Sequence, residues 1–400
     1  MIKELNPSIP SLRFPHFKGK MWNKDLLQNI AAPITDKADS SCTDHVLTLS
    51  CEYGLIIQQN YFEKNIASLN LSRYVKIQNN DFVYNDRVTN LYPYGTIKRN
   101  TLNIRGLVSP IYKCFRFSTK TEPAFWQYYF EAHCHEHELK NIINEGARAG
   151  RFNISIKQFL KIPVFLPDKA EQKKIADCLS SLDELIEAHE QKLDALKQHK
   201  KGLMQRLFPA EGETTPRWRF PEFKNAIEWR KKSLGAICHL QAGKFIDSTK
   251  IFPIWHKGLF PCYGGNGLRG YVEKSNYKTC YPIIGRQGAL CGNVKMPTGE
   301  FYATEHAIVA ECNNDSISNI FLFYFLSKLN INRLAIGQAQ PGISIEIVKK
   351  ISIKLPDIHE QQKIADCLIS IDEQIEAQEE KIKALKEHKK GMMQQLFPSL

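Results

Sequence analysis

The sequence contains no apolar run long enough to cross a membrane and no cysteine pair with metal-binding spacing. Its longest apolar stretch is Ile320–Leu326, far below the roughly 20 residues that span a bilayer. The N-terminus lacks the basic and then apolar pattern of a signal peptide, so we expect a cytoplasmic protein. The 11 cysteines are scattered without a Cys-x-x-Cys, which favours buried free thiols, and we expect no disulfide bond.

Sequence motifs for methyl transfer and nucleotide hydrolysis are also missing. The chain has no Asn-Pro-Pro-Tyr or Asp-Pro-Pro-Tyr, which adenine methyltransferases use to hold the flipped base, and no Walker GxxxxGK[ST]. The segment Gly265–Gly270 matches a dinucleotide-binding fingerprint, but no buried strand precedes it and no amphipathic helix follows it. The sequence therefore predicts neither methyl transfer nor nucleotide hydrolysis by this chain.

Each of two further clusters that resemble active or metal sites has a simpler explanation. Asp168, Glu171 and Lys173 are spaced like a nuclease PD…ExK cluster, but helix capping explains both acids. The repeat described below also has Gln362 in place of the lysine. The neighbouring histidines of His133–His137 cannot share a tetrahedral zinc site without distant ligands, so we expect a surface helix there. The sequence thus predicts a protein that is not an enzyme and binds no metal.

Positive charge is concentrated in two separate blocks. The chain has 400 residues, a net charge of +12 and 43% hydrophobic residues, which allows two or three folded domains. Lys and Arg exceed Asp and Glu by seven over residues 1–167 and by eight over 210–356. Residues 168–209 are neutral and residues 357–400 carry a net charge of −3. Two basic blocks indicate an anionic partner such as DNA, RNA or a membrane surface.

The chain is a tandem duplication. Residues 167–209 recur 189 positions later as residues 356–398, with 30 of 43 positions identical. The tripeptide Arg13-Phe14-Pro15 is likewise echoed by Arg219-Phe220-Pro221 ahead of the second half. A repeat of this kind predicts that the two halves share a common framework.

The repeated segment predicts a long helix. Apolar residues of the first copy recur with the alternating spacing of four and three that is typical of a coiled-coil seam: Ile175, Leu179, Leu182, Ile186, Leu193, Leu196, Leu203 and Leu207. Asp168 and Asp357 are the expected N-caps, with Glu171 and Glu360 as capping-box partners. Pro209 and Pro398 are expected to end the two helices.

The two helices are expected to pair in antiparallel fashion. The first leaves domain one and the second starts at the end of domain two, so the order of the chain fixes their direction. His189, Gln378, Lys200 and Lys389 would place polar groups in the seam at matching heights, or would lie at exposed flanking positions. The expected fold class is α+β, with two globular domains separated by two long antiparallel helices that form a coiled coil, as a pseudo-two-fold tandem repeat.

The segments between the helices are mixed, with glycine-punctuated β-rich runs and helices expected at Glu122–Glu138 and Ser316–Leu329. Segments of the second half closely resemble target recognition domains of type I restriction-modification specificity subunits: YGGNGLRGYV (263–272), IIGRQGALCGNV (283–294), FYATEHAIVA (301–310) and residues 339–368. The first half resembles a different variety of this domain, in RGLVSPIYKCFRF (105–117) and GARAGRFNIS (146–155). With both repeat helices included, the resemblance covers nearly the whole chain.

The resemblance implies a division of labour along the chain. It places target recognition domain 1 at residues 1–166, spacer helix 1 at 167–209, a linker at 210–219, target recognition domain 2 at 220–355 and spacer helix 2 at 356–400. Each recognition domain would read one half of a bipartite, asymmetric DNA site, and the helices would fix the gap between the halves.

The family also implies partners and cofactors. The partners would be double-stranded DNA, two modification (methyltransferase) subunits, which would dock on the helices, and restriction (translocase-nuclease) subunits. No cofactor is expected on this chain. The complex would use S-adenosylmethionine, ATP and magnesium through its other subunits.

Base-reading residues are expected on glycine-bounded loops, because Arg, Asn and Gln can bind base edges bidentately while other basic residues hold phosphates. The candidates of domain one are Arg99, Asn100, Asn103, Arg105, Arg148 and Arg151. Those of domain two are Lys244, Tyr263, Asn266, Arg269, Arg286, Gln287, Gln338 and Gln340. For each of them, solvent exposure or support of a loop is the alternative to a base contact.

Other functions stay open on sequence alone. A specificity subunit of a type II methyltransferase-nuclease would share this architecture and differ only in its partner genes. An independent DNA-binding coiled-coil protein, such as a repressor, would need no enzyme partner. Two unlike readers in one chain argue against a repressor, since repressors usually gain symmetry by homodimerising. The bases that are read and the length of the gap do not follow from the sequence.

Overall fold

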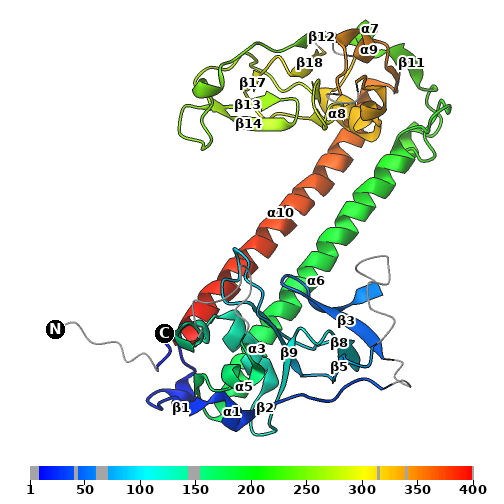
Figure 1. Cartoon of the computed structure of the whole chain (residues 1–400). Coiled ribbons are helices and arrows are strands. Elements are labelled where there is room, and N and C mark those ends of the chain that lie inside the picture. The colour runs from blue at the N-terminus through cyan, green and yellow to red at the C-terminus, as the bar shows by residue number, and fades with distance from the viewer. Residues whose placement is uncertain are drawn as a thin grey trace. The chain divides into compact units, whose positions relative to one another are not determined.

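A computed structural model describes residues 9–39, 44–59, 71–142, 154–312, 316–337 and 341–398. The chain divides into two compact units: unit 1 comprises residues 1–189 and 381–400, and unit 2 comprises residues 190–380. Two long helices, α6 (Lys169–Leu207) and α10 (Ile358–Leu396), each contribute to both units (Figure 1). Among the described helices, none has the length and apolar content needed to cross a membrane.

Unit 1 is built on small β-sheets. Its described strands are β1 (Asn23–Leu26), β2 (Ala31–Pro33), β3 (His45–Ser50), β4 (Gly54–Ile57), β5 (Val75–Ile77), β6 (Phe82–Asn85), β7 (Thr96–Arg99), β8 (Gly106–Val108), β9 (Lys113–Phe117) and β10 (Pro163–Leu166). They form an antiparallel sheet in the order β2-β9-β6-β7, a mixed sheet in the order β4-β3-β8-β5, and the antiparallel pair β1-β10. The short helices are α1 (Leu27–Ile30), α3 (Pro123–Glu131), α4 (Glu136–Ile142) and α5 (Ile156–Phe159).

Aromatic residues make the core of unit 1. Helix α3 buries most of its aromatic side chains in one cluster with residues of β6 and β9, and Trp126 stacks on Phe117 with ring centroids 4.7 Å apart. The sequence predicted one helix from Glu122 to Glu138, but the helix stops at Glu131 and resumes at Glu136 because His133 has a φ of +61°.

The expectation of a surface helix over His133–His137 is met only in part, because His133 and His137 are exposed but the helix begins only at Glu136. Cys134 and His135 lie inside unit 1, and the imidazole of His135 is only 3% exposed. Burial lowers the pKa of His135 to about 3, so this ring is neutral.

Unit 2 has its own sheets. The strands are β11 (Arg230–Ser233), β12 (His239–Ala242), β13 (Phe260–Gly264), β14 (Gly267–Val272), β15 (Ile283–Gly285), β16 (Val294–Lys295), β17 (Tyr302–Ala303), β18 (Ala307–Glu311) and β19 (Ser352–Leu355). Their orders are β12-β18-β15-β16, β14-β13-β17 and β11-β19. The helices are α7 (Leu234–Ile237), α8 (Asn319–Lys328) and α9 (Ile345–Lys349). The glycine-rich segment Gly265–Gly270 is the turn and second strand of the β13–β14 hairpin, so it does not open a nucleotide-binding helix.

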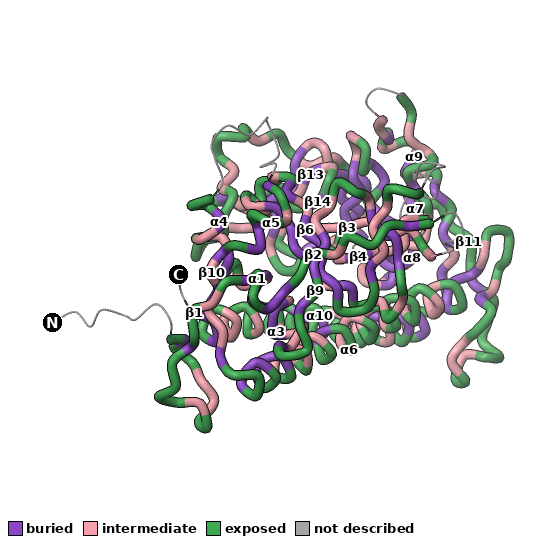
Figure 2. Tube along the Cα trace, turned by 60° about the horizontal axis from the view of Figure 1, so that its bottom comes forward, coloured by how far each residue is buried: buried purple, intermediate pink, exposed green. Residues whose placement is uncertain are grey.

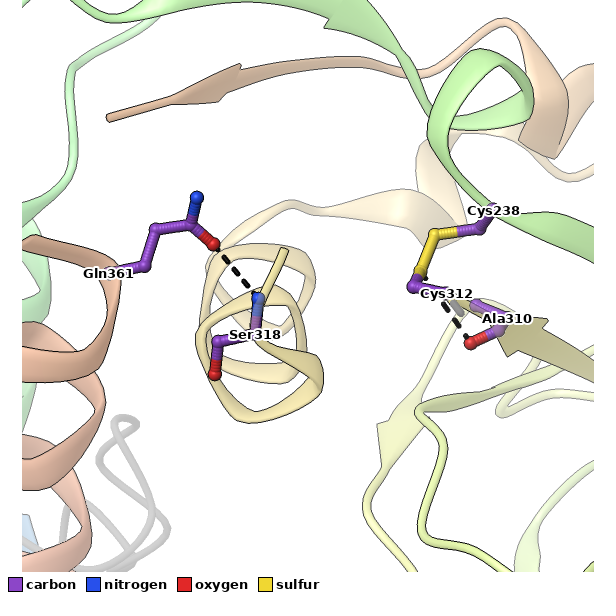
Figure 3. Close-up of a disulfide and its surroundings, with 5 residues drawn as sticks. All are labelled: Cys238, Ala310, Cys312, Ser318 and Gln361. Carbon is purple, nitrogen blue, oxygen red and sulfur yellow. Dashed lines mark hydrogen bonds between the residues drawn. A yellow bond between two sulfur atoms is a disulfide. The ribbon is translucent and has the colours of Figure 1, made fainter. Parts of the chain in front are cut away.

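The duplication extends from the long helices into both units. The antiparallel pairs β1-β10 and β11-β19 correspond, as do the apolar helices α3 and α8. Each long helix also holds the start of the apolar helix of its half, α3 or α8, through a buried glutamine. Gln172 accepts a hydrogen bond from the backbone N–H of Glu122 at 2.9 Å, and Gln361 accepts one from Ser318 at 3.0 Å (Figure 3). The repeated framework therefore makes the same internal contact in each unit.

A buried ion pair ties the Arg-Phe-Pro motif of each half to the start of a long helix. Arg13 binds Glu171 through two hydrogen bonds of 2.8 and 2.5 Å, and Arg219 binds Glu360 through two of the same lengths. Both glutamates are at most 2% exposed. The pKa of Arg219 is raised, chiefly by its hydrogen bonds to Glu360.

The N-caps of the long helices follow the sequence prediction in part. Asp168 accepts a hydrogen bond from the backbone N–H of Glu171 at 2.9 Å, which lowers the pKa of Asp168. Asp357 caps its helix through the N–H of His359, also at 2.9 Å. The capping-box role predicted for Glu171 and Glu360 is wrong, because each carboxylate binds an arginine from a distant part of the chain instead.

Each unit contains an antiparallel segment of the predicted coiled coil. In unit 1, Lys389 binds Asp183 at 2.6 Å; in unit 2, Lys200 binds Asp372 at 2.5 Å. Each lysine also lies over a tyrosine ring: Lys389 is 5.0 Å from the centroid of Tyr128, and Lys200 is 5.2 Å from that of Tyr324. The hydroxyl of each tyrosine donates a hydrogen bond to the aspartate that pairs with its lysine. Buried or half-buried positions recur at intervals among the exposed residues of both helices (Figure 2). The α+β class, the repeat and the helix pairing are confirmed.

The expectation of no disulfide bond is wrong. Cys238 and Cys312 are bonded to each other, with Cα atoms 4.3 Å apart (Figure 3). The register of β12 and β18 explains the pairing: His239 lies opposite Glu311, so the residue before one strand faces the residue after the other. This register depends on contacts 74 residues apart, which the spacing of the cysteines does not reveal.

Candidate nucleic-acid interface

In unit 2 several predicted base-reading residues converge on the turn between β17 and β18. The backbone N–H of Lys244 donates to Ala303 at 3.0 Å, and Thr304 donates to the carbonyl of Tyr263 at 2.9 Å. After β12, Lys244 therefore lies against the end of β17, the strand that also pairs with the Tyr263 strand β13. Its side chain is exposed, whereas Tyr263 is half-buried and burial raises the pKa of its hydroxyl.

The β13–β14 hairpin adds Arg269 to this group. The side chain of Arg269 lies across Gly264, where its Cδ would be 2.6 Å from a Cβ atom. The hydroxyl oxygen of Thr304 would be 3.3 Å from the same Cβ. Gly264 thus provides the space that lets an exposed guanidinium lie over the hairpin beside Thr304.

The remaining described candidates of unit 2 form an adjoining loop cluster. The backbone of Arg286 donates to His306 at 2.8 Å, and Gln287 forms a β-bridge with Gly342. The carbonyl of Gln287 approaches Gly265 so closely that a Cβ there would be 2.6 Å away. Asn266 follows Gly265 at the hairpin turn and is exposed.

We call these six residues the unit 2 reading surface: Lys244, Tyr263, Asn266, Arg269, Arg286 and Gln287. The exposed cations Lys244 and Arg269 suit phosphates or guanine edges, and the two amides suit adenine edges. Arg286 is half-buried, and its guanidinium donates one hydrogen bond to the carbonyl of Glu305 at 3.4 Å. Gln338 and Gln340 lie outside the described residues.

In unit 1 two of the candidates have internal partners. Arg99 donates from Nε to Gln127 at 2.9 Å and from its terminal nitrogen to Asn80 at 3.1 Å, and burial lowers its pKa. Asn100 is fully buried, and its amide donates to the carbonyl of Ile104 at 3.0 Å. The side chain of Asn100 supports the loop that follows β7, the alternative that the sequence left open.

Asn103 and Arg105 occupy the exposed part of this loop. Asn103 has a φ of +55°, a backbone conformation that asparagine adopts more readily than most residues. Arg105 is exposed directly before β8. Arg148 and Arg151 lie outside the described residues. Among the described candidates, Asn103 and Arg105 are thus the two of unit 1 with side chains available to DNA.

The clusters that resembled a metal or nuclease site in the sequence do not form one among the described residues. No group of three or more His, Cys, Asp or Glu within them is arranged to hold a metal ion. Asp168 and Glu171, which resembled nuclease residues, are occupied with capping and with the pair to Arg13. The geometry instead presents cations and amides on exposed loops, an arrangement suited to binding.

One exposed residue beside the unit 2 reading surface was not among the sequence-based candidates. Phe245 follows Lys244, and its ring is 76% exposed. Phenylalanine is usually a core residue, so its exposure could be recognised only from the structure.

Comparisons with known proteins all lead to type I specificity proteins. A family model described as the type I restriction modification DNA specificity domain matches residues 103–198 and 226–387. The specificity subunit of the Escherichia coli type I restriction enzyme EcoprrI is 37% identical over 150 residues, which are 37% of this chain and 37% of that relative. The specificity subunit of type I restriction enzyme MjaVIII of Methanocaldococcus jannaschii is 25% identical over 86% of this chain and 85% of its own length.

A solved structure shares the fold. The S subunit of a type I restriction-modification system from M. genitalium aligns with a TM-score of 0.62 at 16% identity, covering 98% of this chain and 99% of that chain.

Proposed function

The chain belongs to the type I restriction-modification DNA specificity family, and we propose that each of its units reads one half of a bipartite, asymmetric DNA site. Its role is that of a specificity subunit, which recognises DNA and is not itself an enzyme. The relatives described above are named as type I specificity subunits, and they give no support to a type II partner or to an independent coiled-coil protein.

The observation that carries the proposal is a pair of unlike loop surfaces on one repeated framework. Unit 2 brings six candidate residues around the β17–β18 turn, whereas unit 1 offers Asn103 and Arg105 after β7. Different side chains require different base edges, since each base pair presents its own pattern of donors and acceptors in the major groove. The two half-sites should therefore differ. For the domains we retain the sequence-based boundaries, with recognition domains at residues 1–166 and 220–355.

The spacer role belongs to α6 and α10. Each is continuous over 39 residues, about 60 Å of helix. A rigid spacer of constant length would fix how many unread base pairs separate the two halves of the site. The cross-helix pairs of Lys389 with Asp183 and of Lys200 with Asp372 would hold the register of the two helices.

The same helices offer a repeated docking surface for two modification subunits. Their outward positions carry the same small residues at intervals of seven: Ser181, Ala188, Ala195 and Gly202 on α6, and Ser370, Ala377, Ala384 and Gly391 on α10. No atom lies within 4 Å of where a Cβ would stand on either glycine. Two identical stripes suit two copies of one partner, each with a helix that can approach closely. Restriction subunits would join the same complex.

S-adenosylmethionine, ATP and magnesium would act on these partner subunits, and the assembled complex would work on cytoplasmic DNA. A direct test is to co-express the chain with its modification subunits and to map N6-methyladenine by single-molecule sequencing. We expect a split motif with two unlike halves that disappears when this chain is omitted. Methylation that persists without the chain would refute the proposal.

A further inference from the structure

Phe245 follows Lys244 at the edge of the unit 2 reading surface and is largely exposed. Its side chain is 76% exposed, whereas Phe321, Phe325 and Phe301 of the same unit are at most 6% exposed. An exposed phenyl ring forgoes the free energy that burial of apolar surface releases. A partner that covers the ring would recover that free energy.

The backbone around Phe245 is held in a defined position. Gly243 donates its N–H to Ala307 at 3.0 Å, Lys244 donates to Ala303 at 3.0 Å, and the carbonyl of Phe245 accepts from the hydroxyl of Tyr302 at 3.1 Å. Three consecutive residues are thus hydrogen-bonded to β17 and to the start of β18. The fixation leaves little conformational entropy to lose when a partner binds.

Gly243 permits this close approach. A Cβ on that residue would lie 2.1 Å from the carbonyl oxygen of Ala303 and 2.6 Å from that of Thr304. Any other side chain would push the segment away from the turn between β17 and β18. The local fold therefore determines the position of the backbone that carries the ring.

The chemistry of the surroundings identifies the group that the ring meets. Lys244, Arg269 and Tyr263 offer hydrogen bonds or charge, whereas a phenyl ring carries no charge and donates no hydrogen bond. The major groove presents one apolar group, the C5 methyl of thymine, and apolar side chains contact it. A ring carried on a fixed backbone beside the candidate base-reading residues is suited to that methyl group.

Resting on the proposed function, we propose that Phe245 contacts the C5 methyl of a thymine and so makes a T·A pair an obligatory element of the half-site read by unit 2. Arg269→Ala identifies that half-site, because it should relax one half of the methylated motif and leave the other unchanged. Each thymine of this half is then replaced by deoxyuridine in a synthetic duplex, which removes only the methyl group.

The test compares affinities of the complex with its modification subunits. The wild-type complex should bind one deoxyuridine duplex about fourfold more weakly, the effect of one methylene-sized apolar group. The Phe245→Ala complex should bind that duplex and the thymine duplex equally, while Phe245→Leu should keep part of the preference. Ile227→Ala is the matched control, because Ile227 of the same unit is 77% exposed but lies outside the reading surface.

Failure of this inference is distinct from failure of the proposed function. A wild-type complex that binds every deoxyuridine duplex as tightly as the thymine duplex, or a Phe245→Ala complex that still distinguishes thymine from deoxyuridine, would overturn the inference alone. A wild-type complex that methylates no split motif would overturn the proposed function.

Discussion

Replacing Gly264 with alanine should disable Arg269 without unfolding unit 2. Gly264 has no positive φ, so its backbone accepts an alanine. The new methyl group would stand 2.6 Å from Cδ of Arg269, well inside contact distance. Because the arginine side chain is flexible, it would swing off the hairpin. The nearest atom outside that side chain, Oγ1 of Thr304 at 3.3 Å, needs to move only slightly.

The expected loss in DNA affinity follows from the contact that Arg269 would make. A bidentate contact of arginine to a guanine edge contributes about 1–3 kcal/mol, or about 5- to 150-fold in the dissociation constant. Fluorescence anisotropy of the complex with its modification subunits on a duplex carrying the methylated motif measures this loss. The thermal unfolding midpoint of Gly264→Ala should stay close to that of the wild type.

A double-mutant cycle separates positioning from general damage. If Gly264 acts only by placing Arg269, the Gly264→Ala/Arg269→Ala variant should bind no more weakly than Arg269→Ala alone. Additive losses would refute the reasoning, and so would a Gly264→Ala variant that binds like the wild type while Arg269→Ala loses affinity.

Three further predictions concern the framework. Glu360→Ala leaves the guanidinium of Arg219, which is 9% exposed, buried without a counter-charge, so urea denaturation should show a loss of about 3–5 kcal/mol. Glu373 is exposed, so Glu373→Ala should lower the free energy of unfolding by less than about 0.5 kcal/mol. Equal losses in Glu360→Ala and Glu373→Ala would contradict the buried-pair account. Inserting four residues into α6 lengthens it by about 6 Å, so methylation mapping should find a longer gap between unchanged half-sites; altered half-sites would rule out the spacer role. Reducing agent should destabilise unit 2 by about 2–4 kcal/mol through loss of the Cys238–Cys312 bond, an effect that Cys238→Ala should abolish; a non-reduced peptide map without the linked pair would contradict the bond.

The helical framework could be predicted because its determinants are local. Residues such as Ile175 and Leu179 repeat at coiled-coil spacing, and both are at most 1% exposed. Asp168 precedes its helix and caps it through the N–H of Glu171. The duplication then doubled each local signal, so that the second half repeated what the first had indicated.

Long-range pairing was beyond the reach of the sequence. Glu171 looked like a capping residue because Asp168 lies three positions before it, yet its partner Arg13 is 158 residues away. The sequence placed His135 on a surface helix. It did not reveal the break before that residue, which depends on the positive φ of His133 alone.

The candidate interface was predicted with mixed success for the same reason. Glycine-bounded loops of unit 2 pointed to Arg269 and Gln287, but their grouping depends on the register of β13 with β17 and on a bridge to Gly342. In unit 1 the same reasoning selected Asn100, whose amide is used to hold its own loop. Residue type suggests what a side chain can bind, whereas burial decides whether it is available.

The most direct test of two independent readers is methylation mapping of two single variants. Arg105→Ala changes the exposed loop of unit 1, and Arg269→Ala changes the hairpin of unit 2. We expect each variant, co-expressed with the modification subunits, to relax base preference in a different half of the split motif while the gap stays constant. Relaxation of the same half by both variants, or of both halves by either one, would contradict the account.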